Sequence, residues 1–266
     1  MEGGVDITGA LQQGLQQELQ QEQPPAAMEE PEEEELRKRL IAVGVMDIDK
    51  RLGGGLPPQS VTLVEGDPDA GKSIVVQQLG FGALKEGLSV DIFLAEGSTR
   101  DYLQQMESLG MSTTDYYLLG QLSLYRADLR VNRDKAERIL GHLVRHIEDC
   151  GDRDLFIIDS ITSLLFQFDE HYVLSFLATC NDLASRGRTI ITTLHSYAMS
   201  ESLRLRASTI VDAHLRLRIE ELGDQLVRTL EVAKIRGAVK TNKNTVSFTV
   251  QSGLGLKSVP ISKTKA

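Results

Sequence analysis

The residue types in this chain that can do chemistry gather first in one short stretch, Gly66-Asp67-Pro68-Asp69-Ala70-Gly71-Lys72-Ser73. The stretch fits the P-loop pattern G-x-x-x-x-G-K-[ST] at every fixed position. Backbone amides of such a loop, with the positive end of the helix that follows, form a cradle for polyphosphate. We expect the Lys72 ammonium to reach the β- and γ-phosphates and the Ser73 hydroxyl to complete the coordination of Mg²⁺. The stretch therefore predicts ATP and Mg²⁺ as cofactors.

The elements around this loop have the order that a P-loop requires. Residues 60–65 (SVTLVE) are typical of a buried strand, and residues 74–79 (IVVQQL) begin a helix. A glycine-rich turn that matches the pattern by chance is not expected to lie between a buried strand and a helix. We therefore favour phosphate binding over a chance match.

Asp159 is the candidate for the metal side of the site. It ends an apolar strand, residues 154–159, about ninety residues after the P-loop, where a Walker B aspartate is expected. Its carboxylate would orient the ligands of Mg²⁺, often through water. The alternative is an aspartate that caps the next turn, and the joint occurrence with the P-loop favours the metal role.

Glu96 is the candidate for the residue that activates water. Hydrolysis needs a group that orients or deprotonates water near the γ-phosphate. Ser160 follows Asp159, so that position offers no second carboxylate, whereas Glu96 follows the strand of residues 89–95. Glu96 is equally well explained as a solvated carboxylate in a strand-to-helix loop, and both interpretations stay open. The catalytic candidates are Glu96 and Lys72.

Alternating strands and helices must position these residues. From residue 41 onward the pattern is strand, loop and helix in turn, which predicts a mostly parallel sheet with crossover helices. The helices are expected after Ser98 or Thr99, from Asn132, and over residues 173–184, and a further buried strand over residues 188–194. In the last third, apolar and polar residues alternate around 215–219 and 246–250, which predicts half-exposed antiparallel strands at the end of the sheet.

The first forty residues differ from the rest of the chain in charge. Residues 1–40 hold ten acidic residues against Arg37, Lys38 and Arg39, a net of −7 out of −9 for the whole chain. Glutamine, proline and glutamate dominate this segment, which cannot bury enough apolar surface to offset its ordering entropy. We predict a disordered tail over residues 1–40 and one domain over residues 41–266.

Other features of the sequence indicate an ordinary cytoplasmic protein. No apolar run approaches the roughly 18 residues that span a bilayer, and the first residues do not resemble a secretory signal. Cys150 and Cys180 have no C-x-x-C spacing and are expected to be buried thiols. We therefore expect no direct insertion into a membrane.

Two further segments resemble a known family. Residues 43–60 (VGVMDIDKRLGGGLPPQS), which lead into the P-loop, resemble the entry to KaiC- and RadA-type domains of the RecA family. Residues 232–237 (VAKIRG) resemble the Lys-x-Arg-Gly element of KaiC, which implies that Lys234 and Arg236 reach across a subunit boundary to the neighbour's γ-phosphate. Two residues apart on a strand point to one face. An exposed basic edge is the alternative. The resemblance also implies a γ-phosphate sensor at His195, although a histidine at the end of a strand is often structural.

Within this superfamily, the chain resembles the archaellum accessory protein H (FlaH) family. The segments that carry this resemblance are residues 105–110 (QMESLG), 211–218 (VDAHLRLR) and 252–263 (SGLGLKSVPISK). The resemblance covers roughly residues 41–266 and implies a RecA-like fold in an ATP-binding protein that forms a hexameric ring beneath the archaellum motor. It also implies contact with the motor's secretion-type ATPase and with a ring or scaffold protein, at the cytoplasmic face of the membrane, with slow or undetectable hydrolysis.

The chain departs from the wider family in two places that argue against fast turnover. KaiC-like proteins usually carry a pair of glutamates after the second strand, whereas here Glu96 is followed by Gly97. Asp67 and Asp69 stand inside the P-loop, where small residues are usual. Two carboxylates beside a polyphosphate repel it unless they point outward or meet Mg²⁺.

Two other functions remain as alternatives. A RadA-like recombinase needs basic loops for DNA, yet residues 154–185 contain no lysine or arginine, and Arg204 and Arg206 in the next loop are partly offset by acidic residues. We therefore predict no nucleic-acid partner. A KaiC-like autokinase is the second alternative, because Ser208 and Thr209 resemble the Ser-Thr pair that KaiC phosphorylates on itself. A pair of small polar residues in a loop before a strand explains them as well.

Overall fold

The structure, a computed structural model, describes residues 40–222, 225–237 and 244–259. The predicted tail lies outside the described residues except for Leu40, as does the end of the segment 252–263 from residue 260 onward. The residues from Leu40 to the C-terminus group into one unit.

In the described part of the chain, nine strands form one sheet in the order β3-β2-β4-β5-β1-β6-β7-β8-β9. The strands from β3 to β6 along this order are parallel, and β6 to β9 are antiparallel. The P-loop strand β1 lies between β5 and β6 and pairs with both in parallel. The bounds are β1 Val61–Gly66, β2 Val90–Leu94, β3 Leu122–Arg126, β4 Leu155–Asp159, β5 Thr189–His195, β6 Ala213–Leu222, β7 Gln225–Ile235, β8 Thr245–Gln251 and β9 Gly255–Val259.

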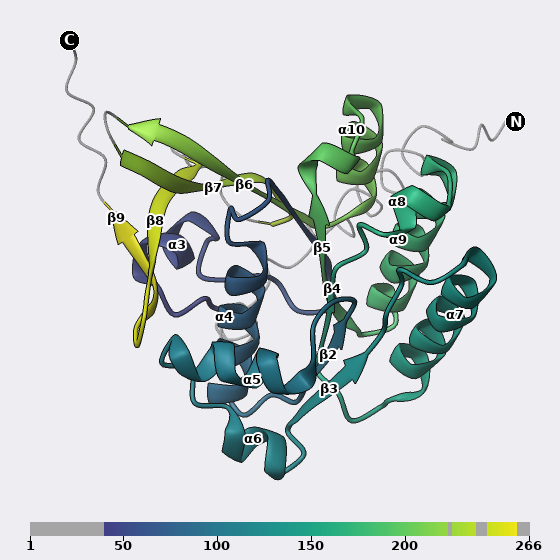
Figure 1. Ribbon diagram of the computed structural model, residues 1–266, viewed down its shortest axis with the longest axis horizontal. Coiled ribbons are helices and arrows are strands. Elements are labelled where there is room, and N and C mark those ends of the chain that lie inside the picture. The colour runs from purple at the N-terminus through teal and green to yellow at the C-terminus, as the bar shows by residue number, and fades with distance from the viewer. Residues whose placement is uncertain (1–39, 223–224, 238–243, 260–266) are drawn as a thin grey trace, which may run out of the picture. The chain divides into compact units, whose positions relative to one another are not determined.

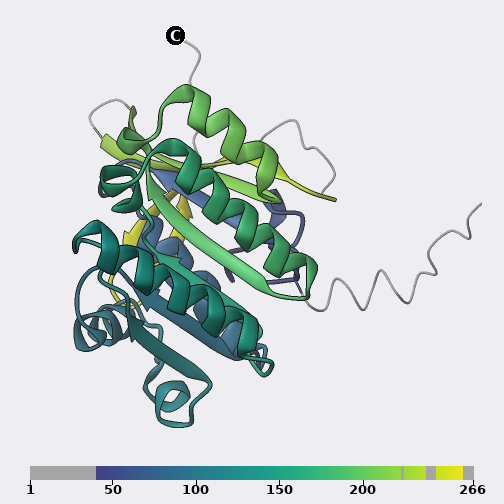
Figure 2. The same ribbon diagram turned by 90° about the vertical axis from the view of Figure 1, so that its right-hand side faces the viewer.

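Helices cover both faces of the parallel part of this sheet. One face carries α3, α4, α5 and α6, and the opposite face carries α7, α8, α9 and α10 (Figures 1 and 2). The bounds are α3 Met46–Arg51, α4 Lys72–Lys85, α5 Thr99–Ser108, α6 Thr114–Leu118, α7 Arg133–Asp149, α8 Leu164–Gln167, α9 Glu170–Ser185 and α10 Glu201–Ile210, with a short 3₁₀ turn η1 Ser196–Ala198. Within the described ranges, no helix is both long enough and apolar enough to cross a membrane.

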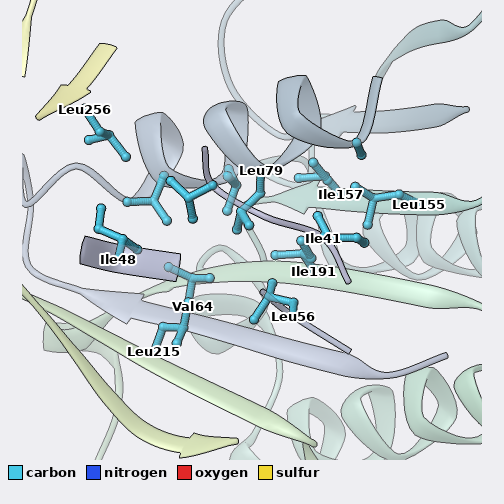
Figure 3. Packing of buried hydrophobic residues seen from close by; sticks show 14 of the residues in the cluster. Ile41, Ile48, Leu56, Val64, Leu79, Leu155, Ile157, Ile191, Leu215 and Leu256 are labelled. Atoms are coloured by element: carbon cyan, nitrogen blue, oxygen red, sulfur yellow. The ribbon is translucent and has the colours of Figure 1, made fainter. Parts of the chain in front are cut away.

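The two helical layers give the central strands two separate apolar cores. Along β4, Leu155 and Ile157 pack into the core under α4, whereas Phe156 and Ile158 pack into the core under α7 and α9. The first of these cores, with Ile157 and Leu79 facing each other, is drawn in Figure 3. Successive side chains of a strand point to opposite faces, so a strand between two helical layers is apolar at every position. This burial fixes the register of the strands whose ends carry the site.

The predicted fold class is confirmed, because the sheet is mostly parallel with antiparallel strands toward the C-terminus. The predicted helix starts also agree with the structure. The Ser98 hydroxyl accepts a hydrogen bond from the Asp101 amide at the start of α5, and the Asn132 side chain accepts one from the Lys135 amide at the start of α7. A side-chain oxygen at this position satisfies a backbone amide that the helix itself leaves free.

Two expectations about the last third were wrong. The strand around Leu215 and Leu217 alternates as expected, with both leucines fully buried and Arg218 exposed, and it pairs with β7 in antiparallel, but β6 lies inside the sheet and not at its end, because β1 pairs with it in parallel. The segment around Arg204 and Arg206, expected as a loop, is the helix α10. On the other face of β6, Arg216 lies 3.9 Å from Glu65 and Arg218 lies 3.5 Å from Glu231.

The two cysteines are free thiols in different surroundings. Cys180 is fully buried, and burial raises its pKa to about 12. Cys150 is only partly buried, with its Sγ 3.4 Å from Nε2 of His146. The same Nε2 lies 2.7 Å from the buried carboxylate of Asp91, which Arg153 also contacts at 3.2 Å. The expectation of two buried thiols is therefore correct for Cys180 alone.

Candidate functional site

The P-loop is a tight turn at the carboxyl end of β1. Asp69 has φ +57° and Gly71 has φ +94°, both in the left-handed region, and α4 begins at the next residue, Lys72. A Cβ at Gly66 would lie 2.8 Å from the carbonyl oxygen of Leu217. Glycine is required at position 66 because the loop passes directly against β6.

The Lys72 side chain folds back onto the P-loop and hydrogen-bonds to its backbone. Its side chain is buried, and its Nζ donates to the carbonyl oxygens of Gly66 at 3.0 Å and Asp67 at 2.8 Å. The same Nζ lies 3.0 Å from Nδ1 of His195. Burial lowers the pKa of Lys72, and nearby aspartates, Asp159 the most, oppose this change. The ammonium is thus already at the position from which it can exchange carbonyl oxygens for phosphate oxygens.

A cavity of about 460 Å³ opens beside the loop and brings most of the predicted site residues together. The predicted residues in its wall are Asp69, Gly71, Lys72, Ser73, Glu96, Asp159 and His195. Gly66, Asp67, Pro68 and Ala70 do not line it and instead shape the turn around it. Carboxyl ends of parallel strands meet at one edge of a sheet, which is why residues so far apart in sequence share this cavity.

Ser73 and Asp159 supply oxygen ligands of the kind that Mg²⁺ prefers. Ser73 is in the first turn of α4, and Asp159 is the last residue of β4. The Asp159 Oδ1 accepts a hydrogen bond from Thr193 Oγ1 at 2.5 Å, which fixes the carboxylate. A hydroxyl and an oriented carboxylate in one cavity fit Mg²⁺, so Ser73 and Asp159 would hold the ion, which would supply positive charge to the phosphates.

Glu96 and His195 both line the cavity, but their side chains differ in exposure to solvent. Glu96 follows β2 on an exposed loop, whereas His195 ends β5 and is half-buried. The pKa of His195 is lowered, first by burial and then by the charge of Lys72, although Glu96, Asp159 and Asp69 oppose this. A neutral imidazole whose Nδ1 accepts from Lys72 keeps Nε2 as a donor. Both residues therefore line the cavity as the sequence predicted, and their roles toward water and phosphate stay predictions.

The two aspartates of the P-loop point to different places. The Asp67 carboxylate accepts a hydrogen bond from Ser196 Oγ and lines a neighbouring cavity instead of the P-loop cavity. Asp69 lines the P-loop cavity. The expected repulsion of a polyphosphate thus concerns Asp69, because the Asp67 carboxylate is turned outward.

Arg228 is a site residue that the sequence analysis missed. It comes from the antiparallel strand β7, lines the cavity, and donates from Nε to the carbonyl oxygen of Asp69 at 2.9 Å. Gln77, Tyr102 and Gln105 also line the cavity without having been predicted. Nothing in the local sequence distinguishes these residues, because only the pairing of β7 with β6 carries Arg228 back to the loop.

Lys234 and Arg236 do not reach the cavity of their own chain. Lys234 Nζ donates to the carbonyl oxygens of Ser208 and Val211, each at 2.7 Å, at the end of α10. Arg236 is beyond the end of β7 and pairs with Asp212 at 2.8 Å. The expectation that both lie on one strand was wrong for Arg236, although both side chains bind the same segment. Their role toward a neighbour's phosphate stays a prediction.

Ser208 and Thr209 lie in the last turn of α10 and not in a loop. Thr209 Oγ1 donates to the carbonyl oxygen of Arg206 at 2.7 Å, and the Ser208 carbonyl accepts from Lys234. Neither residue lines the P-loop cavity. Phosphorylation within one chain therefore has no support from their position, and a neighbouring chain would have to supply the phosphate.

Comparison with known proteins adds four findings. Residues 41–261 match the protein family described as ATPase: KaiC. The archaeal flagellar ATP-binding protein FlaH of Sulfolobus acidocaldarius is 31% identical over 230 residues, which are 85% of this chain and 100% of the relative. The crystal structure of the flagellar accessory protein FlaH from Methanocaldococcus jannaschii aligns with a TM-score of 0.70 at 25% identity, over 83% of this chain and 98% of that one. A KaiC-like protein from Pyrococcus horikoshii shares the fold, with a TM-score of 0.69 at 22% identity over 84% and 99% of the two chains.

Proposed function

Because the chain belongs to the KaiC family of ATPases and, within it, to the FlaH family of archaeal flagellar ATP-binding proteins, we propose that it binds ATP with Mg²⁺ as a component of the archaellum. The observation that carries this proposal is the convergence of Lys72, Ser73 and Asp159 on one cavity beside the P-loop. These three residues supply a cation for phosphate oxygens and two oxygen ligands for the metal.

Titration calorimetry with ATP tests the binding proposal directly. We expect saturable binding of one ATP per chain, tighter with Mg²⁺ than with excess EDTA, because Ser73 and Asp159 would hold the ion and its charge would offset that of the phosphates. GTP and ADP in parallel titrations measure how far the base and the γ-phosphate contribute. No heat of binding with any of these nucleotides would overturn the proposal.

The proposal extends to a ring, expected to be hexameric, in which ATP lies at subunit boundaries. Lys234 and Arg236 support it, because neither residue lines the P-loop cavity of the chain to which it belongs. The side chain of Arg236 is also 68% exposed. Arginine and lysine near a neighbour's terminal phosphate would make nucleotide part of the contact between subunits. Light scattering coupled to gel filtration, with and without Mg²⁺-ATP, checks this, and a monomer under both conditions would contradict it.

The partners proposed for the ring are the motor's secretion-type ATPase and the ring or scaffold protein of the archaellum, at the cytoplasmic face of the membrane. Support comes from the FlaH relatives, whose names place them in the archaeal flagellum. Co-purification with each tagged partner, in the presence and absence of ATP, is the appropriate experiment. We expect ATP to increase recovery of both partners.

Hydrolysis is proposed to be slow. Glu96 is the carboxylate available for water, it is exposed, and Gly97 follows it. An exposed carboxylate holds water less firmly than one that is fixed by neighbours. Phosphate release measured on the co-purification sample tests this, and turnover above roughly one per second, the lower end of typical enzyme rates, would contradict a holding role.

A second candidate function, autophosphorylation between neighbouring chains, is favoured by one contact. Lys234 binds the Ser208 carbonyl at 2.7 Å, so a Lys234 that reached a neighbour's γ-phosphate would bring Ser208 and Thr209 close to it. A phosphate there adds about −1.5 to −2 charges and would change the contact between subunits. Mass spectrometry after incubation with ATP decides the matter, and an unmodified 208–209 peptide removes this function.

A further inference from the structure

Gln77 is a fully buried polar residue on the helix that follows the P-loop. It lies four residues after Ser73 on α4, and residues at this spacing share one face of a helix. Its side chain is 0% exposed and lines the P-loop cavity. A glutamine is seldom fully buried unless its amide has hydrogen-bond partners. This one therefore needs an explanation that its apolar neighbours on α4 do not provide.

The Gln77 amide has one of its two polar atoms satisfied. Nε2 donates to Oε1 of Gln105 on α5 at 3.0 Å, which sets the orientation of the amide. Oε1 of Gln77 is buried and has no hydrogen-bond partner among the residues that the structure describes. A buried acceptor left without a donor costs on the order of 1–3 kcal/mol. A donor that arrives with a ligand would offset this cost.

Tyr102 lies next to Gln77 and has the same property. It is 7% exposed, it lines the same cavity, and its buried hydroxyl has no partner at full hydrogen-bond geometry in the described part of the chain. Burial raises its pKa well above the ordinary value, the charge of Asp159 raises it further, and a weak hydrogen-bonding contact with the Gln77 side chain lowers it. The hydroxyl thus stays neutral and lies within the electrostatic reach of the expected Mg²⁺ ligand.

Magnesium chemistry requires acceptors of this kind. Mg²⁺ loses water reluctantly and usually keeps several water ligands beside one or two protein oxygens and the phosphates. Water bound to a cation donates hydrogen bonds, so the protein around it must supply acceptors. The cavity already has Ser73 and Asp159 for the ion itself. The carbonyl oxygen of an amide and a neutral phenol oxygen are suitable acceptors for its water.

We propose that Gln77 and Tyr102 accept hydrogen bonds from water molecules bound to Mg²⁺, and that they thereby fix the ion against Ser73 and Asp159. The two residues are positioning residues, because they act on the ion through its water. The proposal rests on ATP and Mg²⁺ binding in the P-loop cavity and adds to it the residues that set the strength of the metal contact.

Gln77→Met is the principal variant, since methionine has a similar length and lacks the acceptor. We expect ATP affinity in excess EDTA to stay within about twofold of the unaltered protein. The gain in affinity on adding Mg²⁺ should fall roughly tenfold, the lower end for loss of an outer metal contact. Mn²⁺ binding to the ATP complex, followed by electron paramagnetic resonance, should weaken by a similar factor.

Gln78→Met is the matched control. Gln78 is the next residue of the same helix, and its Oε1 is also buried without a hydrogen-bond partner among the described residues. It faces away from the site, however, since a Cβ at Gly255 would lie 2.5 Å from that atom, and Gln78 does not line the P-loop cavity. We expect this variant to keep the full effect of Mg²⁺.

Tyr102→Phe provides a second variant that removes a single oxygen. It should reduce the effect of Mg²⁺ about threefold, which is the lower end of one neutral hydrogen bond. Thermal unfolding of every variant shows whether folding is retained. If the unaltered protein binds Mg²⁺-ATP but Gln77→Met and Tyr102→Phe respond to Mg²⁺ as Gln78→Met does, the outer contacts proposed here are wrong. If the unaltered protein binds no nucleotide, the proposed function itself has failed.

Discussion

The parallel part of the sheet and its antiparallel extension use their charged residues in opposite ways. In the parallel part, Lys72 and Asp159 come from separate elements and meet in one cavity. In the extension, Lys234 and Arg236 turn back onto the end of α10 and Asp212. Parallel strands all end at one edge, so motif residues at strand ends converge. Antiparallel strands alternate in direction, so their ends lie at both edges of the sheet. The neighbours of a basic residue near such an end depend on the register of strand pairing.

Lys72→Ala should give the largest effect in the parallel part. Loss of the ammonium that meets the β- and γ-phosphates should weaken ATP binding by about 100-fold, the upper range for a hydrogen bond to a charged group. Calorimetry measures this, with Lys85→Ala at the other end of α4 as the control. Tight ATP binding by Lys72→Ala would show that the cavity is not the nucleotide site.

Lys234→Ala should affect the extension without affecting nucleotide affinity in the monomer. Removal of Nζ leaves the Ser208 and Val211 carbonyls without this donor, and we expect the free energy of unfolding to fall by about 1–2 kcal/mol. Arg236→Ala should leave stability almost unchanged because its pair with Asp212 is exposed on one side.

Both variants should lose ATP-dependent assembly if the extension completes a neighbour's site. Urea unfolding and light scattering separate the effect on stability from the effect on assembly. Arg218→Ala on β6, which breaks a partly exposed pair with Glu231 of β7, is the control. Normal assembly by Arg236→Ala would mean that the basic end of the extension serves its own chain only.

Arg228→Ala should give an intermediate result, because this residue links the two regions. Its Nε holds the Asp69 carbonyl at 2.9 Å from a strand of the extension. We expect ATP affinity to fall about fivefold, as for one partly exposed contact of a charged group. Stopped-flow measurement with a fluorescent ATP analogue should show the change mainly in dissociation. If the ATP affinity did not change, the nucleotide would make its contacts with the parallel part of the sheet and not with Arg228.

His195→Gln should give the smallest effect on stability, seen as a change in its dependence on pH. Burial and the charge of Lys72 hold the native pKa of His195 below its ordinary value of 6.5. The unfolded chain therefore binds this proton more readily, so the free energy of unfolding falls as the pH drops through 6.5 toward the lowered native pKa. Above 6.5 this loss is absent.

Replacing His195 should make stability less dependent on pH between about 7 and 5, the range in which an ordinary histidine titrates. Urea midpoints across this range measure the difference, and His171→Gln on the exposed side of α9 is the control. An identical pH dependence in both variants would show that the contact with Lys72 does not set the titration of His195.

Local patterns predicted the elements of the parallel part well. The P-loop, the ends of β2, β4 and β5, and the N-caps Ser98 and Asn132 all follow from short segments, because buried strands are apolar throughout and caps act within three residues. The extension was predicted less well. Alternation in β6 predicted its buried leucines and its exposed face, but not its parallel pairing with β1, which depends on a strand far away in sequence.

Short segments of the sequence were enough to predict the P-loop, the α/β class of the fold and the carboxylate at the end of β4, since each depends on a few neighbouring residues. Which further residues lie beside that loop is known only from the packing of the folded chain. The pairing of β7 with β6 brings Arg228 to the cavity, and the contact between α4 and α5 brings Gln77 and Tyr102 together there. Lys234 lies away from the cavity, because it is hydrogen-bonded to the end of α10. Contacts between distant segments depend on register and packing, which local periodicity does not encode.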